Sequence, residues 1–490
     1  MSVRFSNWAE RPAYRIIAIP VLIVISVLLA QQIQSQPALM LGAIGAAFGL
    51  ALVIWRPYWA LIALLALNPF NLMLATAVAG VSHYPLGVAS NWKDALLVAL
   101  VLRGVAGQLH EGGLRIPSSL GDRFLIVFVA MHVCYLALAP DFQAGVYSLA
   151  RHIEGPLLFL AIIALKPPRP VIRACVVAVL LPALVMSVGA IVERVPGPRF
   201  VTFWGGYVPG PASSSYAGDG RFYRSGSFFG TPLLLGFFLA AAAPFSVALL
   251  RAHRKGLRRL ALATALTGIV ALALTVTRTA YIGGGLGLLV AATTGLRRGW
   301  RFIALWTAVV VSAGVILSYA AGNPLLTKPD EGNAHLTSLQ FDIQRISDRP
   351  LLGFGLGTTD AVRYRFGSYQ LIGASESNYM AQALELGIPG LLLYLGSLIS
   401  LGWRLRNARR ELTERDPEGA LFAAGALAAL VGVAGAGLFL GLVELPVEAF
   451  VWGSGALAIS AVALLQGTDT VVGHDAEALG APAARASIPS

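Results

Sequence analysis

The chain has 490 residues, of which 57% are hydrophobic and only 12% are charged, and its mean hydropathy is +0.72. Soluble globular proteins carry about 25% charged residues, so this composition excludes an ordinary water-soluble protein and predicts a polytopic membrane protein. The net charge of +12 suggests nucleic-acid binding at first sight, and the position of that charge along the chain decides whether the interpretation holds.

Apolar runs long enough to cross a bilayer recur along most of the chain. A hydrocarbon core about 30 Å thick needs roughly 20 apolar residues per helix, and fourteen candidate runs predict an all-α bundle of 12–14 transmembrane helices. The first run has a basic flank like a signal peptide, but glutamines follow it rather than a small-residue cleavage site, so it is predicted to stay in the protein. The runs begin near Ile16, Ala38, Trp59, Asp94, Phe124, Tyr147, Val171, Phe229, Leu260, Ala280, Phe302, Gly387, Ala420 and Val447.

The distribution of basic residues predicts the orientation of this bundle. With both termini in the cytoplasm, the segments assigned to the cytoplasmic side hold 24 of the 36 Lys and Arg residues, in line with the tendency of these residues to stay inside. Acidic residues favour the opposite side. The basic excess is therefore explained by topology, and the sequence no longer supports nucleic-acid binding.

Polar segments between the spans divide the chain. Two long outer segments are predicted at 193–228 and 321–386, between helical regions at 1–192, 229–320 and 387–466. The tail at 467–490 is rich in Ala, Gly, Ser and Pro and is predicted to be a disordered cytoplasmic segment. The two cysteines, Cys134 and Cys175, fall within spans and are interpreted as small core residues.

Arginines on the outer side are the first candidates for function. Arg221 and Arg224 precede a helix start near Pro232, and Arg278 lies in an outer turn between two strongly apolar spans. A guanidinium group binds phosphate oxygens in pairs and stays charged, so these arginines point to a phosphorylated lipid. The alternative interpretations are a snorkelling anchor for Arg278 and solvated loop charge for the others.

The longer outer segment shows helical periodicity. Its apolar and polar residues fall on different faces, which predicts an amphipathic helix lying on the membrane or over a cavity. Arg349-Pro350 is expected to end this helix, and a glycine-rich turn at 353–357 follows. The apolar face consists of Leu336, Leu339, Ile343 and Ile346, and the polar face of Gln340, Gln344 and Ser347.

A second helix is predicted to start at Ser375-Glu376-Ser377-Asn378, where polar side chains can cap exposed backbone N–H groups. It is expected to end at Gly387, with Pro389 opening the next span. The charge of Glu376 at a helix start is favoured by the helix dipole, which suits a general base better than a protonated acid.

Several chemistries have no motif in this sequence. The glycine-rich turn lacks the Lys-Ser/Thr of a nucleotide-binding loop, and the sequence has no HExxH, no paired CxxC and no Asp-x-Asp. ATP chemistry is therefore disfavoured, and neither a metal nor a cofactor is predicted. Arg151-His152-Ile153-Glu154 is interpreted as a structural ion network at the outer end of a helix.

Four segments resemble motifs of one known family. Residues 221–232 resemble its segment of Arg, Gly, an aromatic and then Pro that opens a span, and Thr277-Arg278-Thr279-Ala280 resembles its Ser/Thr-Arg turn. Residues 349–357 resemble its Pro-Leu-x-Gly-x-Gly signature. Ser377-Asn378-Tyr379 with residues 385–390 resembles its His-Asn-x-Tyr…Glu-x-Gly-Ile-x-Gly segment. The family is the bacterial O-antigen ligase and O-antigen and exopolysaccharide polymerase superfamily, and the resemblance covers roughly 221–392.

This resemblance implies a metal-independent membrane glycosyltransferase of the bacterial inner membrane, with its active face and both long outer segments in the periplasm. The implied donor is a glycan on undecaprenyl diphosphate: an acceptor hydroxyl attacks the anomeric carbon and the lipid diphosphate leaves. Arginines can neutralise the charge that develops on this leaving group. Besides the donor, the lipid bilayer and other polysaccharide-assembly proteins are expected partners. The expected substrate-binding residues are Arg221, Arg224, Arg278, Arg345, Arg349, Ser377, Asn378 and Tyr379.

Two positions depart from the family pattern. Ser377 stands where the family usually has a histidine, and His335 stands about where its ligases usually have an arginine. A serine cannot act as a general base unaided, so Glu376 or His335 is expected to take that role, with Arg278 as the third candidate catalytic residue. A solvated loop histidine and a helix-start charge are the plainer interpretations of the first two. The departures favour a polymerase.

Two other functions remain open. A ligase would transfer the finished glycan to a different acceptor by the same chemistry. A polyprenyl-glycan or solute transporter would predict broken helices with ionisable groups at the middle of the membrane, whereas the informative charges here are predicted at outer helix ends.

Overall fold

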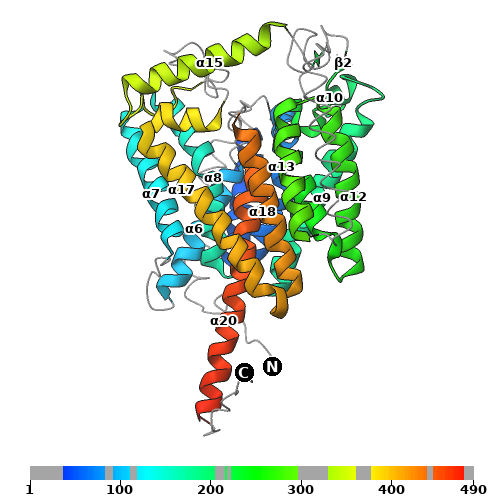
Figure 1. Ribbon diagram of the computed structural model, residues 1–490, viewed down its shortest axis with the longest axis vertical. Coiled ribbons are helices and arrows are strands. Elements are labelled where there is room, and N and C mark those ends of the chain that lie inside the picture. The colour runs from blue at the N-terminus through cyan, green and yellow to red at the C-terminus, as the bar shows by residue number, and fades with distance from the viewer. Residues whose placement is uncertain are drawn as a thin grey trace, which may run out of the picture.

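The computed structural model describes residues 37–82, 92–110, 119–204, 216–217, 222–295, 329–359, 377–438 and 445–478. These residues are almost entirely helical, and most of the helices stand side by side in a bundle with α15 across one end (Figure 1). Two short strands, β1 (Tyr216–Ala217) and β2 (Phe222–Tyr223), pair antiparallel at that end.

The helices follow the predicted apolar runs closely. They are α2 (Pro37–Trp55), α3 (Pro57–Leu67), α4 (Asn71–Ser82), α6 (Trp92–His110), α7 (Leu120–Tyr135), α8 (Phe142–Leu165), α9 (Arg169–Val192), α10 (Arg199–Phe203), α11 (Pro232–Ala248), α12 (Lys255–Leu274), α13 (Arg278–Gly295), α15 (Pro329–Asp348), α17 (Asn378–Arg415), α18 (Pro417–Gly437), α19 (Leu445–Glu448) and α20 (Ser454–Ala478). Short 3-10 segments are η2 (Asn68–Phe70), η3 (Leu136–Leu138), η4 (Ser227–Phe229) and η5 (Leu249–Arg251), and η6 (Ala449–Gly453) is π-helical.

Nine helical stretches in the described part of the chain are long and apolar enough to cross a membrane, which supports a multi-pass membrane protein. The predicted count of about fourteen is not confirmed. The runs near Ala38, Asp94 and Ala280 do form helices, namely α2, α6 and α13, but these are not among the nine. The runs near Ile16 and Phe302 lie outside the described residues.

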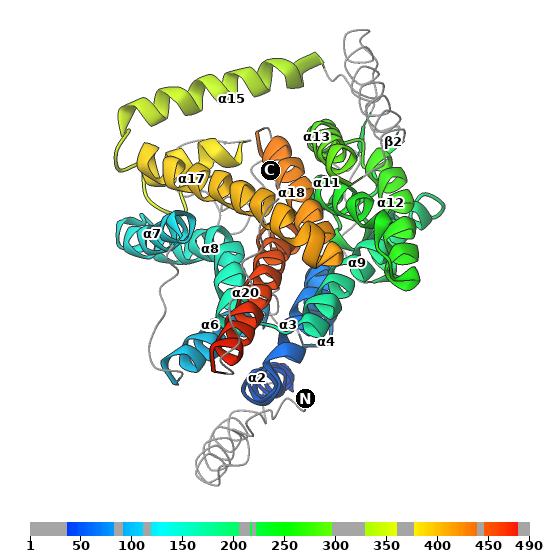
Figure 2. The ribbon, with the colours of Figure 1, turned by 60° about the horizontal axis from the view of Figure 1, so that its bottom comes forward.

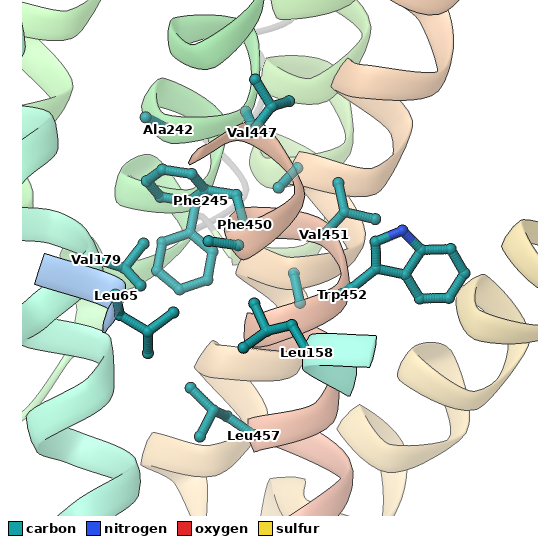
Figure 3. Packing of buried hydrophobic residues seen from close by; sticks show 14 of the residues in the cluster. Leu65, Leu158, Val179, Ala242, Phe245, Val447, Phe450, Val451, Trp452 and Leu457 are labelled. Carbon is teal, nitrogen blue, oxygen red and sulfur yellow. The ribbon is translucent and has the colours of Figure 1, made fainter. Parts of the chain in front are cut away.

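The core lies where α8, α9 and α11 meet the α19–η6–α20 segment (Figure 3). Phe245 of α11 packs edge-on against Phe450 of η6, with ring centroids 5.6 Å apart. Elsewhere small residues bring backbones into contact: a Cβ atom at Gly283 of α13 would overlap the carbonyl oxygen of Gly432 in α18. Such close packing of small residues is typical of helices that associate within a membrane.

One end of the bundle carries a cluster of arginines. Helices α9, α12 and α18 all begin at one end, where Arg169 pairs with Asp416 at 3.2 Å and Glu418 contacts Arg173 at 3.2 Å and Arg254 at 3.7 Å. We call this the basic end. The same three helices finish at Val192, Leu274 and Gly437, so Glu193 and Thr275, which directly follow the first two, lie at the opposite end of the bundle.

The predicted amphipathic helix is present as α15, and it ends just before Arg349-Pro350 as expected. It lies against α17 (Figure 2). Two residues of its predicted apolar face are exposed, Leu339 at 39% and Ile343 at 55%, whereas Ile346 is half-buried. Among residues 337–348 of α15, the buried side chain is the polar Asp342.

At the carboxyl terminus, α20 continues to Ala478 and so enters the segment predicted to be a disordered tail. Proline is what stops a helix most firmly, and the first proline after α20 is Pro482. Residues 479–490 lie outside the described part of the chain.

Candidate active site at the end opposite the basic end

Glu193, at the carboxyl end of α9, holds the segment that carries Arg224. Its carboxylate accepts hydrogen bonds from the backbone N–H groups of Gly226 at 2.9 Å and Ser227 at 2.7 Å, and from the hydroxyl of Tyr223 at 2.8 Å. The side chain is fully buried, and burial raises the pKa of Glu193 to about 7. The resemblance singled out the segment but not this carboxylate, which the sequence showed only as a boundary residue.

Arg224 joins this segment to the turn that precedes Arg278. Its Nε donates to the carbonyl oxygen of Thr275 and its Nη2 donates to Oγ1 of Thr277, both at 2.9 Å. The backbone N–H of Ser225 adds a bond to the carbonyl oxygen of Leu274 at 3.2 Å. Two of the motifs recognised in the sequence are thus in direct contact, and part of the donor capacity of Arg224 is used to connect them.

The turn itself is strained. Val276 has φ +47°, and Ser227 in the neighbouring segment has φ +49°. A β-branched residue in the left-handed region is a true outlier, and such strain persists only where surrounding contacts determine the backbone. Arg224 supplies two of those contacts.

Arg278 begins α13 directly after this turn and is half-buried. The structure therefore places it at the end of a helix, as predicted, and at the bundle end opposite the basic end. Arg224 is also half-buried. Its side-chain hydrogen bonds hold the turn at Thr275–Thr277, and Arg278 directly follows this turn in the chain.

The glycine-rich turn packs into the kink of α17. Gly387 interrupts α17 with φ +73° and ψ −179°, which confirms the predicted break before Pro389. The backbone N–H of Ile388 donates to the carbonyl oxygen of Pro350 at 2.7 Å, and those of Phe354 and Gly355 donate to the carbonyl oxygens of the residues just before the kink. The other two sequence motifs are therefore also in contact with each other.

Glu385 lies at the centre of this contact and is fully buried. Its Oε1 accepts from the hydroxyl of Thr359 at 2.7 Å and from the backbone N–H of Gly357 at 3.2 Å, while its Oε2 accepts from the hydroxyl of Ser148 at 2.6 Å. His152 stands 3.6 Å from the same Oε2. A carboxylate enclosed in this way joins α8, α17 and the turn, and it has no surface left for a substrate.

The Ser-Asn-Tyr segment at the start of α17 is used mainly for packing. Ser377 is the residue before the helix, but its hydroxyl points to the carbonyl oxygen of Gly437 at 3.4 Å and makes no capping bond. Asn378 donates to the hydroxyl of Tyr394 at 2.8 Å, and Tyr379 donates to the carbonyl oxygen of Ala434 at 2.8 Å. The helix starts where predicted, although Ser377 does not cap it.

The remaining predicted residues are less informative. Arg345 lies 3.6 Å from Asp348 and 5.2 Å from the centre of the Phe341 ring, and Arg349 stacks 5.1 Å above Phe354. Arg221 and Glu376 lie outside the described residues. His335 falls within α15, but its side chain is outside the described part. Neither candidate general base is therefore placed.

A buried cluster of charges includes one residue expected from the sequence, Glu154, and others that were not predicted. Lys93 of α6 forms an ion pair with Glu154 of α8 and contacts Asp94 at 2.9 Å. The network predicted around Glu154 exists, but it lies at the middle of α8 rather than at an outer end, because α8 begins at Phe142. Glu448, buried beside Gly155, extends it. An ionisable residue within an apolar run, here Glu154, is the sequence feature that could have indicated this cluster.

Within the described residues, His, Cys, Asp and Glu side chains form no group of three that could hold a metal ion. No protein-family model matches the chain, and no curated protein is detectably similar to it.

Proposed function

We propose that the protein is a polysaccharide polymerase that extends a lipid-linked oligosaccharide at the periplasmic face of the bacterial inner membrane. The observation that carries this proposal is the bonding of Arg224 to the strained turn before Arg278. It gathers two arginines from separate sequence motifs at the bundle end remote from the basic end. By the positive-inside tendency, the basic end is the cytoplasmic one.

The proposed reaction is a glycosyl transfer from a polyprenyl diphosphate. The acceptor hydroxyl oxygen forms a bond to the anomeric carbon, and the bond from that carbon to the diphosphate oxygen breaks. The electron pair leaves with the lipid diphosphate, whose negative charge Arg278 would stabilise through its guanidinium donors. Arg224 would hold the turn that orients Arg278. The hydroxyl proton passes to a base, for which Glu376 and His335 remain the candidates.

The glycine-rich turn and the kink of α17 would supply a rigid wall beside this reaction. Glu385 holds the turn against α8, so the chain is fixed as far as Thr359. Residues supported in this way lose little orientation when the substrate binds, which favours catalysis.

A purified assay tests the proposal. The full chain in proteoliposomes is given a defined undecaprenyl-diphosphate oligosaccharide, and the products are scored for chain length and for acceptor identity. Products longer than the donor repeat, still attached to the polyprenyl carrier, would support the polymerase. Transfer only to a different added acceptor would indicate a ligase, and the absence of any new glycosidic bond would contradict both.

A transporter is the second candidate, because a specific observation favours it. The Lys93–Glu154 pair lies at the middle of α8, Glu448 is buried next to the π-helical η6, and α17 is broken at Gly387. Ionisable groups beside interrupted helices are typical of transporters. In the same proteoliposomes, donor that crosses the membrane without being extended would support this function and overturn the first.

A further inference from the structure

A groove between three helices has its charged mouth at the basic end. Helix α9 packs between α3 and α12 (Figure 2), and the space along them encloses about 770 Å³. Most of its lining is apolar, including Ile62, Phe70, Leu181 and Val185. We propose that this groove binds the acyl chain of an anionic phospholipid of the cytoplasmic leaflet, with the phosphate at its charged mouth.

The groove has the length of one leaflet. It extends along α9 from Arg173 to Val185, which corresponds to about 18 Å at the rise of an α-helix. Half of a hydrocarbon core measures roughly 15 Å. A lipid whose headgroup lies at Arg173 would therefore place its chain along the whole apolar lining and end near the bilayer midplane.

The mouth of the groove is positively charged. Arg173 and Arg254 both contact Glu418, so two guanidinium groups share a single carboxylate. Arg254 keeps 62% of its side chain exposed. The connection from Arg251 to Lys255 adds further basic residues and no acidic ones. A phosphate group complements this excess of positive charge, whereas a headgroup with no net charge gains much less from it.

The start of α12 adds backbone donors at the same place. Arg254 precedes the helix without a capping side-chain bond, and Gly256 in its first turn lines the groove with open space where a Cβ would stand. The first N–H groups of a helix have no partner within the helix and favour anions. The arginines, the open helix start and the apolar groove together fit one phospholipid.

Native mass spectrometry of the purified full chain tests this proposal. The protein is titrated with phosphatidylglycerol and with phosphatidylcholine of the same acyl chains, and inorganic phosphate serves as a control for headgroup binding alone. We expect one phosphatidylglycerol to be retained in preference to phosphatidylcholine, with no stable phosphate adduct. Equal retention of the two lipids would overturn the proposal, and so would binding of phosphate at the same site.

Three variants separate a site from general surface charge. Arg254→Ala should weaken phosphatidylglycerol retention roughly fivefold, whereas Arg259→Ala, with the same charge change on the same helix, should not. Ala174→Trp leaves the arginines intact but fills the groove near its mouth, and it should abolish the preference. Similar effects of Arg254→Ala and Arg259→Ala, or undiminished binding to a correctly folded Ala174→Trp variant, would contradict the proposed site.

Discussion

The buried carboxylate of Glu385 positions the glycine-rich turn against α8 and takes no part in the proposed reaction. It accepts bonds from Ser148, Thr359 and a backbone N–H, and these donors come from α8 and from the turn after Gly357. If the carboxylate were removed, the donors of Gly357 and Thr359 would lose their acceptor, which costs about 1–3 kcal/mol for each buried group left without a partner. The residue is therefore assigned to fold and positioning.

We predict that Glu385→Ala lowers the thermal unfolding temperature strongly and that Glu385→Gln lowers it less, because glutamine keeps one acceptor oxygen. The change is measured on purified protein in the same detergent. Glu414→Gln is a matched control, since Glu414 lies on the same helix and is exposed. Equal unfolding temperatures for Glu385→Ala and the control would refute the structural role of Glu385.

Glu193 predicts a pH dependence at the other motif pair. An exposed glutamate has its pKa near 4.5, and burial raises the pKa of Glu193 to about 7. We call the Tyr223–Gly230 segment closed when it covers Glu193 and open when Glu193 is exposed to water. Between these two pKa values, Glu193 holds a proton in the closed form and loses it in the open form. Raising the pH through this window favours opening, and above about pH 7 no further change is expected. Its bonding partners do not titrate in this range.

Hydrogen exchange of the Tyr223–Gly230 segment, corrected for the intrinsic rate, should show less protection at pH 8 than at pH 5. Glu193→Gln should remove most of this difference, because it has no proton to lose. The same protection at both pH values in the unsubstituted protein would show that Glu193 does not control the segment.

At the scale of elements, the kink of α17 is what receives the glycine-rich turn. A Cβ atom at Gly387 would lie 2.6 Å from backbone atoms of Leu351, and the backbone there has φ +73°. Both facts oppose any larger residue. The helix break and the docking of the turn therefore depend on the same glycine.

We predict that Gly387→Ala displaces the turn and makes residues 349–359 sensitive to limited proteolysis, together with a lower unfolding temperature. Gly396→Ala serves as its control in the same helix, because a Cβ there meets only ordinary contacts at 3.6 Å. If the two variants are cleaved alike, the kink does not hold the turn.

At the scale of the whole molecule, apolar periodicity was enough to predict most helices, but not how many of them cross the membrane. Charge patterns predict that the four motifs share one side of the membrane. The contact between Arg224 and Thr277, which are 53 positions apart, could not be predicted, and neither could the contact between Ser148 and Glu385, which are 237 apart. Contacts over such distances depend on how helices pack, and local pattern does not encode this. For the same reason, the pairing of Lys93 with Glu154 was missed.

The predicted orientation can be checked by labelling. In a background of Cys134→Ser and Cys175→Ser, Thr202→Cys lies exposed in α10 near the candidate site, and Glu411→Cys lies exposed near the basic end. A membrane-impermeant thiol reagent added to spheroplasts should label the first and not the second. The reverse pattern would place the candidate site in the cytoplasm and exclude the proposed periplasmic reaction.

The most direct measurement of the central claim is the rate of chain extension by Arg278→Ala in the purified assay. We predict a loss of about a hundredfold or more, with partial activity in Arg278→Lys, which keeps the charge but not the planar donors. Arg259→Ala, at the basic end, should extend chains at the normal rate. Normal extension by a correctly folded Arg278→Ala variant would contradict the assignment of this end of the bundle as the active site.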